Sequence, residues 1–136
     1  TIEEVARTGI QIYCEGGAGE SYGNKLFDNA VHNAQFDGMN LTEFCDDHLV
    51  VRNVVTHCIF DGIKIGGDFN YIFQNHITSN FISGGSFGLV FLATADGNSY
   101  SQNMARNNNV DFADFGGGFY PNSSFVDNMI AGPPPM

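Results

Sequence analysis

The chain has 136 residues, of which 43% are hydrophobic and 15% are charged. This length and composition predict one globular domain and argue against a disordered chain. The net charge of −10 and the five lysines and arginines argue against binding to DNA or RNA, and the apolar runs are too short to cross a membrane.

The first residues, "TIEE" at 1–4, match a capping box and predict a short capping helix within residues 1–8. The chain starts at Thr1 without a signal peptide, which leaves a secreted or extracellular location open. We expect a single domain, 1–136, whose coils occupy residues 9–132. Residues 133–136 are expected to form a tail, because proline cannot donate a hydrogen bond to a strand ladder.

Five segments repeat around an asparagine: "LFDNAV", "VVRNVV", "IFQNHI", "YSQNMA" and "FVDNMI". The anchors are Asn29, Asn53, Asn75, Asn103 and Asn128. Apolar residues stand three before and two after each anchor. Five before the anchor is a side chain that can form hydrogen bonds in a turn: Asn24, His48, Asn70, Asn98 and Ser123. Upstream lies a second apolar strand pattern, "GIQI", "GMNL", "GIKI" or "GLVF", which is degenerate in the fifth copy.

The anchors are 24, 22, 28 and 25 residues apart, and each unit holds three short runs of alternating apolar residues. This pattern predicts three strands per unit, with successive units stacked as the coils of a parallel β-helix. We expect about five coils. The anchor amides would pair along the stack and satisfy one another; the alternative is that they are surface turn asparagines.

The repeat resembles that of the pectin-lyase-like superfamily and covers the chain from about Gly9 to Gly132. The resemblance implies an all-β fold, a right-handed single-stranded parallel β-helix. It also implies a poly- or oligosaccharide partner, bound along the first strand of each coil. Such a fold hosts many chemistries, so the resemblance does not fix the reaction.

Comparison with the polygalacturonase members of that superfamily gives a partial match. "QFDGMNL" matches at Asp37 and "FDGIKI" at Asp61, but Phe60 and Phe87 stand where the second aspartate and the histidine belong. A complete hydrolase site is therefore not expected, and whether the protein is an enzyme stays open. Asp37 and Asp61 remain the candidate catalytic pair, because repulsion between neighbouring carboxylates can separate their pKa values. The alternative is that both are ordinary Asp-Gly turns.

Three residues are candidates for binding a saccharide: Lys64, Phe69 and Tyr120. Lys64 is expected to point outward from the presumed binding strand. Phe69 and Tyr120 lie in expected loops, where a ring can stack on a sugar or pack against the coil.

Asp46, Asp68 and Asp96 each lie seven residues before an anchor. The repeat therefore predicts that the three carboxylates stack along one edge. Stacked like charges favour a cation, and oxygen ligands suit Ca²⁺. The alternative is three turn aspartates that point into water.

The three cysteines, Cys14, Cys45 and Cys58, show no metal-binding spacing, and their odd number leaves at least one thiol unpaired or intermolecular. We expect them to be buried as small apolar residues, and the histidines to have structural roles. A short β-helix also exposes strand edges at its ends. Because five coils are short, a homo-oligomer joined through these ends or a fragment of a longer β-helix is a further expectation. The alternative function is a non-catalytic structural or assembly module.

Overall fold

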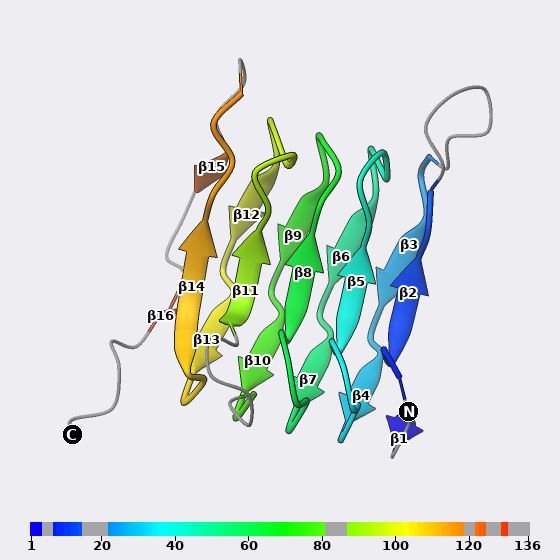
Figure 1. Ribbon diagram of the computed structural model, residues 1–136, viewed down its shortest axis with the longest axis vertical. Helices are drawn as coiled ribbons and strands as arrows, with labels where there is room; N and C mark the ends of the chain where they lie inside the picture. Colours follow the sequence, from blue (N-terminus) through cyan, green and yellow to red (C-terminus); the bar gives the residue numbers. More distant parts are fainter. Residues whose placement is uncertain (4–6, 15–21, 81–86, 119–121, 125–128, 131–136) are drawn as a thin grey trace.

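The computed structural model describes residues 1–136 except 4–6, 15–21, 81–86, 119–121, 125–128 and 131–136. Every regular element among the described residues is a β-strand (Figure 1). None of the described residues lies in a helix long and apolar enough to cross a bilayer. The predicted all-β class is confirmed.

The strands form three parallel sheets, each named here after its first strand. The β1 sheet contains β1 (Ile2–Glu3), β4 (Ala30–His32), β7 (Val54–Thr56), β10 (His76–Thr78), β13 (Met104–Arg106) and β16 (Met129–Ile130). The β2 sheet contains β2 (Ile10–Ile12), β5 (Met39–Leu41), β8 (Ile63–Ile65), β11 (Phe87–Phe91) and β14 (Val110–Asp114). The β3 sheet contains β3 (Lys25–Phe27), β6 (Leu49–Val51), β9 (Tyr71–Phe73), β12 (Ser99–Ser101) and β15 (Ser123–Ser124).

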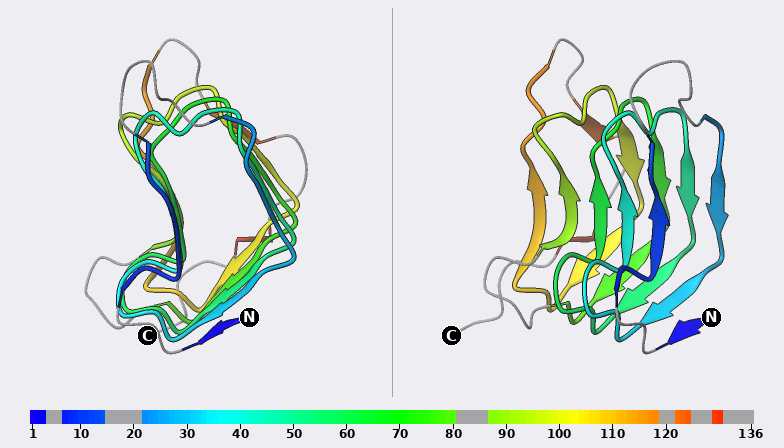
Figure 2. Two further views of the ribbon diagram at one scale, coloured as in Figure 1. Left: turned by 90° about the vertical axis from the view of Figure 1, so that its right-hand side faces the viewer. Right: turned by 45° about the vertical axis from the view of Figure 1, so that its right-hand side comes forward.

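Each sheet takes every third strand, so the chain contributes one strand to each sheet before it returns to the first. The three sheets enclose one interior, and the β2 sheet bows inward toward the other two (Figure 2). This arrangement is a parallel β-helix. Its five or six strands per sheet agree with the predicted number of about five coils.

The interior consists of rows of apolar side chains at equivalent positions of successive coils. One row pairs Val31 with Val55, Val55 with Ile77, and Ile77 with Ala105, and all four side chains are buried. Two further rows are also in register. One is formed by the residues three before each anchor, and the other by the apolar residues of the "GIxI" strands. Stacking therefore buries an apolar face that one coil could not bury alone.

The glycine that opens each "GIxI" strand is required by the neighbouring row. A Cβ atom on Gly38 would clash with Val55 Cγ1 and would lie 2.7 Å from the carbonyl oxygen of Gly62. A Cβ atom on Gly62 would clash with Ile77 in the same way. The β2 sheet can approach the β1 sheet this closely only because these residues lack a side chain.

The anchor asparagines form a hydrogen-bonded ladder through the interior. Asn75 Oδ1 accepts hydrogen bonds from both Asn53 N and Asn53 Nδ2 at 2.9 Å. Asn75 Nδ2 donates to Asn103 Oδ1 at 3.0 Å and to the carbonyl oxygen of Val50 at 2.8 Å. Asn53, Asn75 and Asn103 are at most 2% exposed, so the ladder interpretation is confirmed for these rungs. Asn128 lies outside the described residues.

Two further ladders lie five residues before and five residues after the anchors. The first runs from Asn24 through His48, Asn70 and Asn98. It ends on Asn122, which accepts from Asn98 N at 2.8 Å, so the prediction of Ser123 for this rung was wrong. The other ladder includes Cys58, Asn80 and Asn108, and it was not predicted.

Each rung of these three ladders from Asn24 to Asn108 follows a residue in the left-handed region of backbone space. Gln74 (φ 54°) precedes Asn75, Phe69 (φ 53°) precedes Asn70, and Ser79 (φ 60°) precedes Asn80. Non-glycine residues adopt this conformation uncommonly, and it persists only where the surroundings impose it. The buried amide hydrogen bonds supply that constraint and turn the chain at each corner of the coil.

The prediction of an N-terminal capping helix was wrong for those of residues 1–8 that the structure describes. Ile2 and Glu3 form strand β1, which pairs in parallel with Val31 and His32 of β4. Parallel pairing with the next coil satisfies their backbone, and an isolated capping box cannot outweigh it. Ile2, Ile10, Ile12 and Leu26 of this first coil are only partly buried.

We expect the Asn75→Ala substitution to lower the free energy of unfolding by roughly 3 kcal/mol, because two buried backbone groups, Asn53 N and Val50 O, lose their partners. Urea unfolding followed by circular dichroism measures the change.

The matched control is Gln74→Asn, since Gln74 is exposed and asparagine tolerates its left-handed backbone. The control should change stability by less than about 0.5 kcal/mol. Equal effects of the two substitutions would show that the ladder does not stabilise the fold.

Candidate functional site

The outward face of the β2 sheet carries a row of polar side chains. Gln11 of β2 pairs in register with Asn40 of β5, and Asn40 with Lys64 of β8. The next residue in this row, Val90, is buried. The polar row therefore spans three neighbouring strands of the sheet that bows inward in Figure 2.

Asp37 and Asp61 lie at the start of two of these strands and meet at Lys64. Lys64 Nζ lies 3.4 Å from Asp37 Oδ2 and 3.4 Å from Asp61 Oδ2. Asn40 Nδ2 also donates to Asp37 Oδ2, at 3.2 Å. Both carboxylates are nearly buried, at 6% and 8% exposed, and Lys64 is half-buried. The predicted pair and the predicted lysine thus form one cluster.

The second oxygen of each aspartate has a structural partner. Asp37 Oδ1 accepts a hydrogen bond from Asp61 N at 3.2 Å, and Asp61 Oδ1 accepts one from Phe87 N at 2.9 Å. Each carboxylate therefore links its coil to the next. One oxygen is held by the backbone, and the other faces Lys64.

Burial raises the pKa of the Asp37 carboxyl, and the nearby charge of Asp61 adds to this. The positive charge of Lys64 and the hydrogen bonds from Asp61 N and Lys64 oppose the effect. A carboxyl group with a raised pKa beside a second carboxylate can act as a general acid.

A pocket of about 370 Å³ opens next to the polar row and is lined by Arg7, Thr8, Gln11 and Phe36. The rings of Phe36 and Phe60 stack with their centroids 5.4 Å apart and an interplanar angle of 14°. Phe36 is 50% exposed and Phe60 is 40% exposed. This face thus combines amide, carboxylate and ammonium groups with two accessible aromatic rings.

Phe69, predicted to bind a saccharide, lies elsewhere. It is an exposed corner residue that precedes the Asn70 rung, and its backbone N donates to the carbonyl oxygen of Asp96 at 3.0 Å. Tyr120 lies outside the described residues.

Asp46, Asp68 and Asp96 stack on successive coils, as the repeat predicted. Asp46 Oδ1 accepts from Asp68 N at 2.7 Å, and Asp68 Oδ1 accepts from Asp96 N at 2.8 Å. Burial raises the pKa of the Asp68 carboxyl, as do the charges of Asp46 and Asp96, while the Asp96 N–H lowers it. The row is thus a carboxylate ladder, with like charges along one edge.

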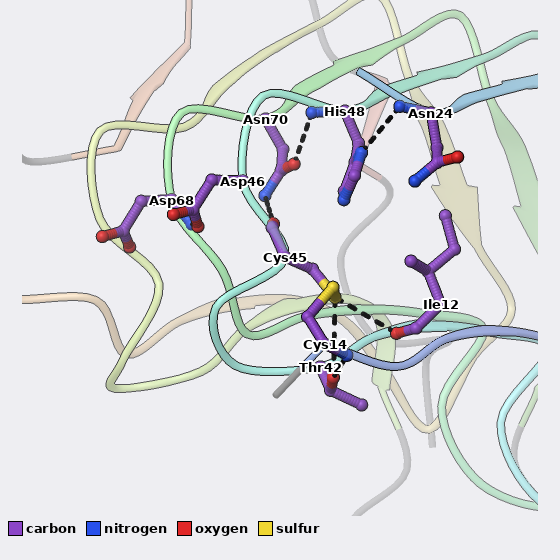
Figure 3. The surroundings of a disulfide bond; sticks show 9 residues. All are labelled: Ile12, Cys14, Asn24, Thr42, Cys45, Asp46, His48, Asp68 and Asn70. Atoms are coloured by element: carbon purple, nitrogen blue, oxygen red, sulfur yellow. Dashed lines mark hydrogen bonds between the residues drawn. A yellow bond between two sulfur atoms is a disulfide. The ribbon is translucent and has the colours of Figure 1, made fainter. Parts of the chain in front are cut away.

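A disulfide joins Cys14 and Cys45, which are 31 residues apart, so the expectation that these two are simple apolar residues was wrong. A loop of this length corresponds to a stabilisation of roughly 3 to 4 kcal/mol. Cys58 is buried and unpaired, which confirms the prediction of at least one unpaired thiol, and burial raises the pKa of its thiol to about 11. Figure 3 shows the disulfide and its surroundings.

One group among the described residues brings three potential metal ligands together. The sulfurs of Cys14 and Cys45 and a ring nitrogen of His48 lie within 4.8 Å of one another. The two sulfurs are bonded to each other and cannot serve as thiolate ligands in this state.

The sequence reasoning missed two parts of the site. Gln11 and Asn40 were not singled out, although both occupy the x position of "GIQI" and "GMNL", one residue before the second apolar residue. That position points outward on a half-buried strand, so it carried a usable signal. The stacking of Phe36 on Phe60 was also missed, although both rings stand directly before the aspartates of the two "DG" pairs.

Comparison of the chain with models of protein families, with curated proteins and with solved structures finds no match to any of them. The parallel β-helix is therefore established by the repeat and the strand pairing alone.

We expect Asp68→Asn to raise the melting temperature at pH 7. The raised pKa of Asp68 means that this carboxyl stabilises the fold while it is protonated, and that this stabilisation is lost as the pH rises through the folded-state pKa. Asparagine keeps the acceptor for Asp96 N and removes the charge. The difference between variant and wild type should vanish below the unfolded pKa of about 3.9. Thermal unfolding between pH 3 and pH 7 measures it.

The matched control is Asp47→Asn, which removes an exposed charge from the residue that follows Asp46 but is not itself part of the carboxylate ladder. A calcium ion held by the Asp46, Asp68 and Asp96 row would raise the melting temperature of the wild type and of Asp47→Asn, but not of Asp68→Asn. An equal response to calcium in all three proteins would contradict a metal site here.

Proposed function

We propose that the outward face of the β2 sheet binds a neutral oligosaccharide. The observation that carries the proposal is the continuity of the polar row with the pocket: Gln11 belongs to both, and Phe36 lines the pocket and stacks on Phe60. Ligand sites combine apolar and aromatic surface with a few fixed polar groups. Sugars offer both hydroxyl groups and apolar ring faces.

The side chains of the row suit hydroxyl ligands. The amides of Gln11 and Asn40 each offer a donor and an acceptor, and Lys64 offers a donor. Lys64 is held in place by two carboxylates, so a ligand would meet an ordered ammonium group. Preorganised groups of this kind bind at a lower entropic cost than flexible ones.

The charge of the protein favours a neutral ligand over an acidic one. The cluster of Asp37, Asp61 and Lys64 has two carboxylates for one ammonium, and the whole chain carries a net charge of −10. A polyuronate would be repelled at low ionic strength. This separates the proposed ligand from the acidic substrates of many pectin-lyase-like enzymes.

We expect neutral oligosaccharides such as glucan or xylan fragments to bind, and oligogalacturonate to bind at least about tenfold more weakly. Asn40→Ala and Phe36→Ala should each weaken binding by about tenfold, the effect of about 1.4 kcal/mol from one lost contact. Isothermal titration calorimetry measures the affinities.

The control is Thr78→Ala, which changes a middle-coil strand of the β1 sheet on the other side of the molecule. It should leave the affinity unchanged. Failure of every neutral saccharide to bind, or equal losses in Thr78→Ala and Asn40→Ala, would refute the proposal.

A second candidate is hydrolysis of the bound saccharide by Asp37 and Asp61. The raised pKa of the Asp37 carboxyl, caused first by burial, favours this role. Release of reducing ends that is lost in Asp61→Asn, with binding intact, would support catalysis, because the asparagine keeps the acceptor for Phe87 N. Intact binding with no product would leave a binding module.

Assembly through the end of the helix is the remaining alternative function. The interior-facing residues Ile2, Ile10, Ile12 and Leu26 of the first coil are only partly covered. A monomer in sedimentation equilibrium would argue against assembly, and an oligomer without saccharide binding would favour it.

A further inference from the structure

His48 departs from the pattern of its own ladder. The other rungs of this ladder are asparagines: Asn24, Asn70, Asn98 and, in the last described coil, Asn122. His48 performs the same task, since its Nδ1 accepts a hydrogen bond from Asn24 N at 2.9 Å. Its backbone N donates to Asn70 Oδ1 at 2.8 Å. The ladder itself therefore gives no reason for a histidine at this rung.

His48 differs from the asparagine rungs in its second ring nitrogen, Nε2. Because Nδ1 accepts a hydrogen bond, the proton of the neutral imidazole is on Nε2. Burial lowers the pKa of His48 and favours this neutral form, although Asp46 and Asp47 oppose the shift. The side chain is fully buried, and Nε2 has no hydrogen-bond partner among the residues that the structure describes. A buried donor without a partner is costly.

The unpartnered nitrogen faces the disulfide. Figure 3 shows Nε2 on the side of the ring that points toward Cys14 and Cys45, away from Asn24. A ring nitrogen of His48 and the two sulfurs lie within 4.8 Å of one another. The next rung, Asn70, also reaches Cys45, but its Nδ2 donates to the carbonyl oxygen at 2.9 Å and so has its partner.

The surroundings of Cys45 also suit a reduced sulfur. The carbonyl oxygen of Ile12 lies 3.3 Å from Cys45 Sγ, and Thr42 Oγ1 lies 3.5 Å from it. A disulfide sulfur has no proton to donate to Ile12, but a thiol does. Thr42 Oγ1 accepts from Cys14 N at 3.1 Å, so its own proton is available to a sulfur.

We propose that Cys14 and Cys45 form a reversible thiol–disulfide couple, and that His48 Nε2–H stabilises a thiolate of the reduced pair. Oxidised, the couple ties the first coil to the second. Reduced, it gives His48 the charged acceptor that it otherwise lacks. The couple thus controls how firmly the first coil, which has a neighbouring coil on one side only among the described residues, is held.

The exchange needs an external thiol, such as a dithiol reductant or glutathione. Its thiolate attacks the sulfur of Cys14, because the residue Cys14 is 5% exposed while Cys45 is fully buried. The bond between the two protein sulfurs breaks, a mixed disulfide forms at Cys14, and Cys45 leaves as a thiolate. A second thiolate then releases Cys14. Two electrons pass to the protein, and the reductant becomes a disulfide.

A metal site on the same three residues is less well supported. Coordination through Nε2 would move the ring proton to Nδ1, which would then face the N–H of Asn24 instead of accepting from it. Two donors would oppose each other in a buried corner of the coil. The ladder therefore fixes the tautomer that donates to sulfur.

The experiment compares the wild type with His48→Asn in a Cys58→Ala background. Asparagine occupies this rung in the neighbouring coils, and alanine occupies the Cys58 position in the preceding coil as Ala34, so both changes follow the protein's own repeat. The folded proteins are equilibrated in buffers of reduced and oxidised dithiothreitol or glutathione. Alkylation and mass spectrometry then count the free thiols.

We expect the reductant to reduce the wild-type disulfide while the protein stays folded. His48→Asn should shift the thiol–disulfide equilibrium by about tenfold toward the disulfide, which is about 30 mV for two electrons. The oxidised proteins should unfold at similar urea concentrations. Should His48→Asn not fold, nitrogen NMR of wild-type His48 is expected to show the Nε2–H tautomer in both states, with its proton shifted downfield on reduction.

Three results would overturn the proposal. One is an unchanged equilibrium in His48→Asn, and another is reduction that occurs only with global unfolding. The third is zinc that protects the reduced wild-type thiols from alkylation but fails to protect those of His48→Asn, which would assign a metal site instead.

Discussion

The fold depends on buried amides that are satisfied only by the neighbouring coil. The oxygen of Asn75 takes two hydrogen bonds from the coil before it, and its nitrogen reaches the coil after it. Inside the stack, each such group without its partner in the neighbouring coil would cost about 1 to 3 kcal/mol. Each coil therefore stabilises the next, and the molecule is cooperative along its axis although its contacts are between nearest neighbours.

The same hydrogen bonds determine the cross-section. Rungs at five-residue intervals leave room for the three-residue strands of the β1 and β3 sheets, and each of these strands from β3 to β13 is followed by a left-handed residue that turns the chain. Side chains as large as Arg52 and Phe69 adopt this conformation, at φ 54° and φ 53°. The corner is thus set by the rung that follows and not by the identity of the residue that turns.

The periodic part of the structure could be predicted because stacking demands equivalent residues at equivalent places. The anchor ladder and the apolar rows were visible for that reason. The ladder through Asn80 and Asn108 was hidden, because Ala34 and Cys58 occupy its positions in the earlier coils. The disulfide was hidden as well, since the Cys14 and Cys45 positions show no repeat.

The site could be predicted only where its residues share a position in the repeat. Asp37 and Asp61 do so, and the structure brings them together. Their common contact with Lys64 depends on side-chain length and direction, which no spacing reveals. Phe69 was proposed as a saccharide ligand because it lies in a loop, and the structure places it at a corner, directly before the Asn70 rung.

At each position, a ladder of this kind favours the residue type whose burial costs the least free energy. A different residue at such a position therefore indicates another demand on the chain. Asparagine satisfies a corner completely, because its oxygen takes the backbone N–H and its nitrogen finds a carbonyl oxygen, as in Asn70. Histidine satisfies only the first requirement and buries a second donor. That loss in stability is offset only if the donor acquires an acceptor, and the sulfur atoms of the neighbouring cysteines are the acceptors that the fold places within reach.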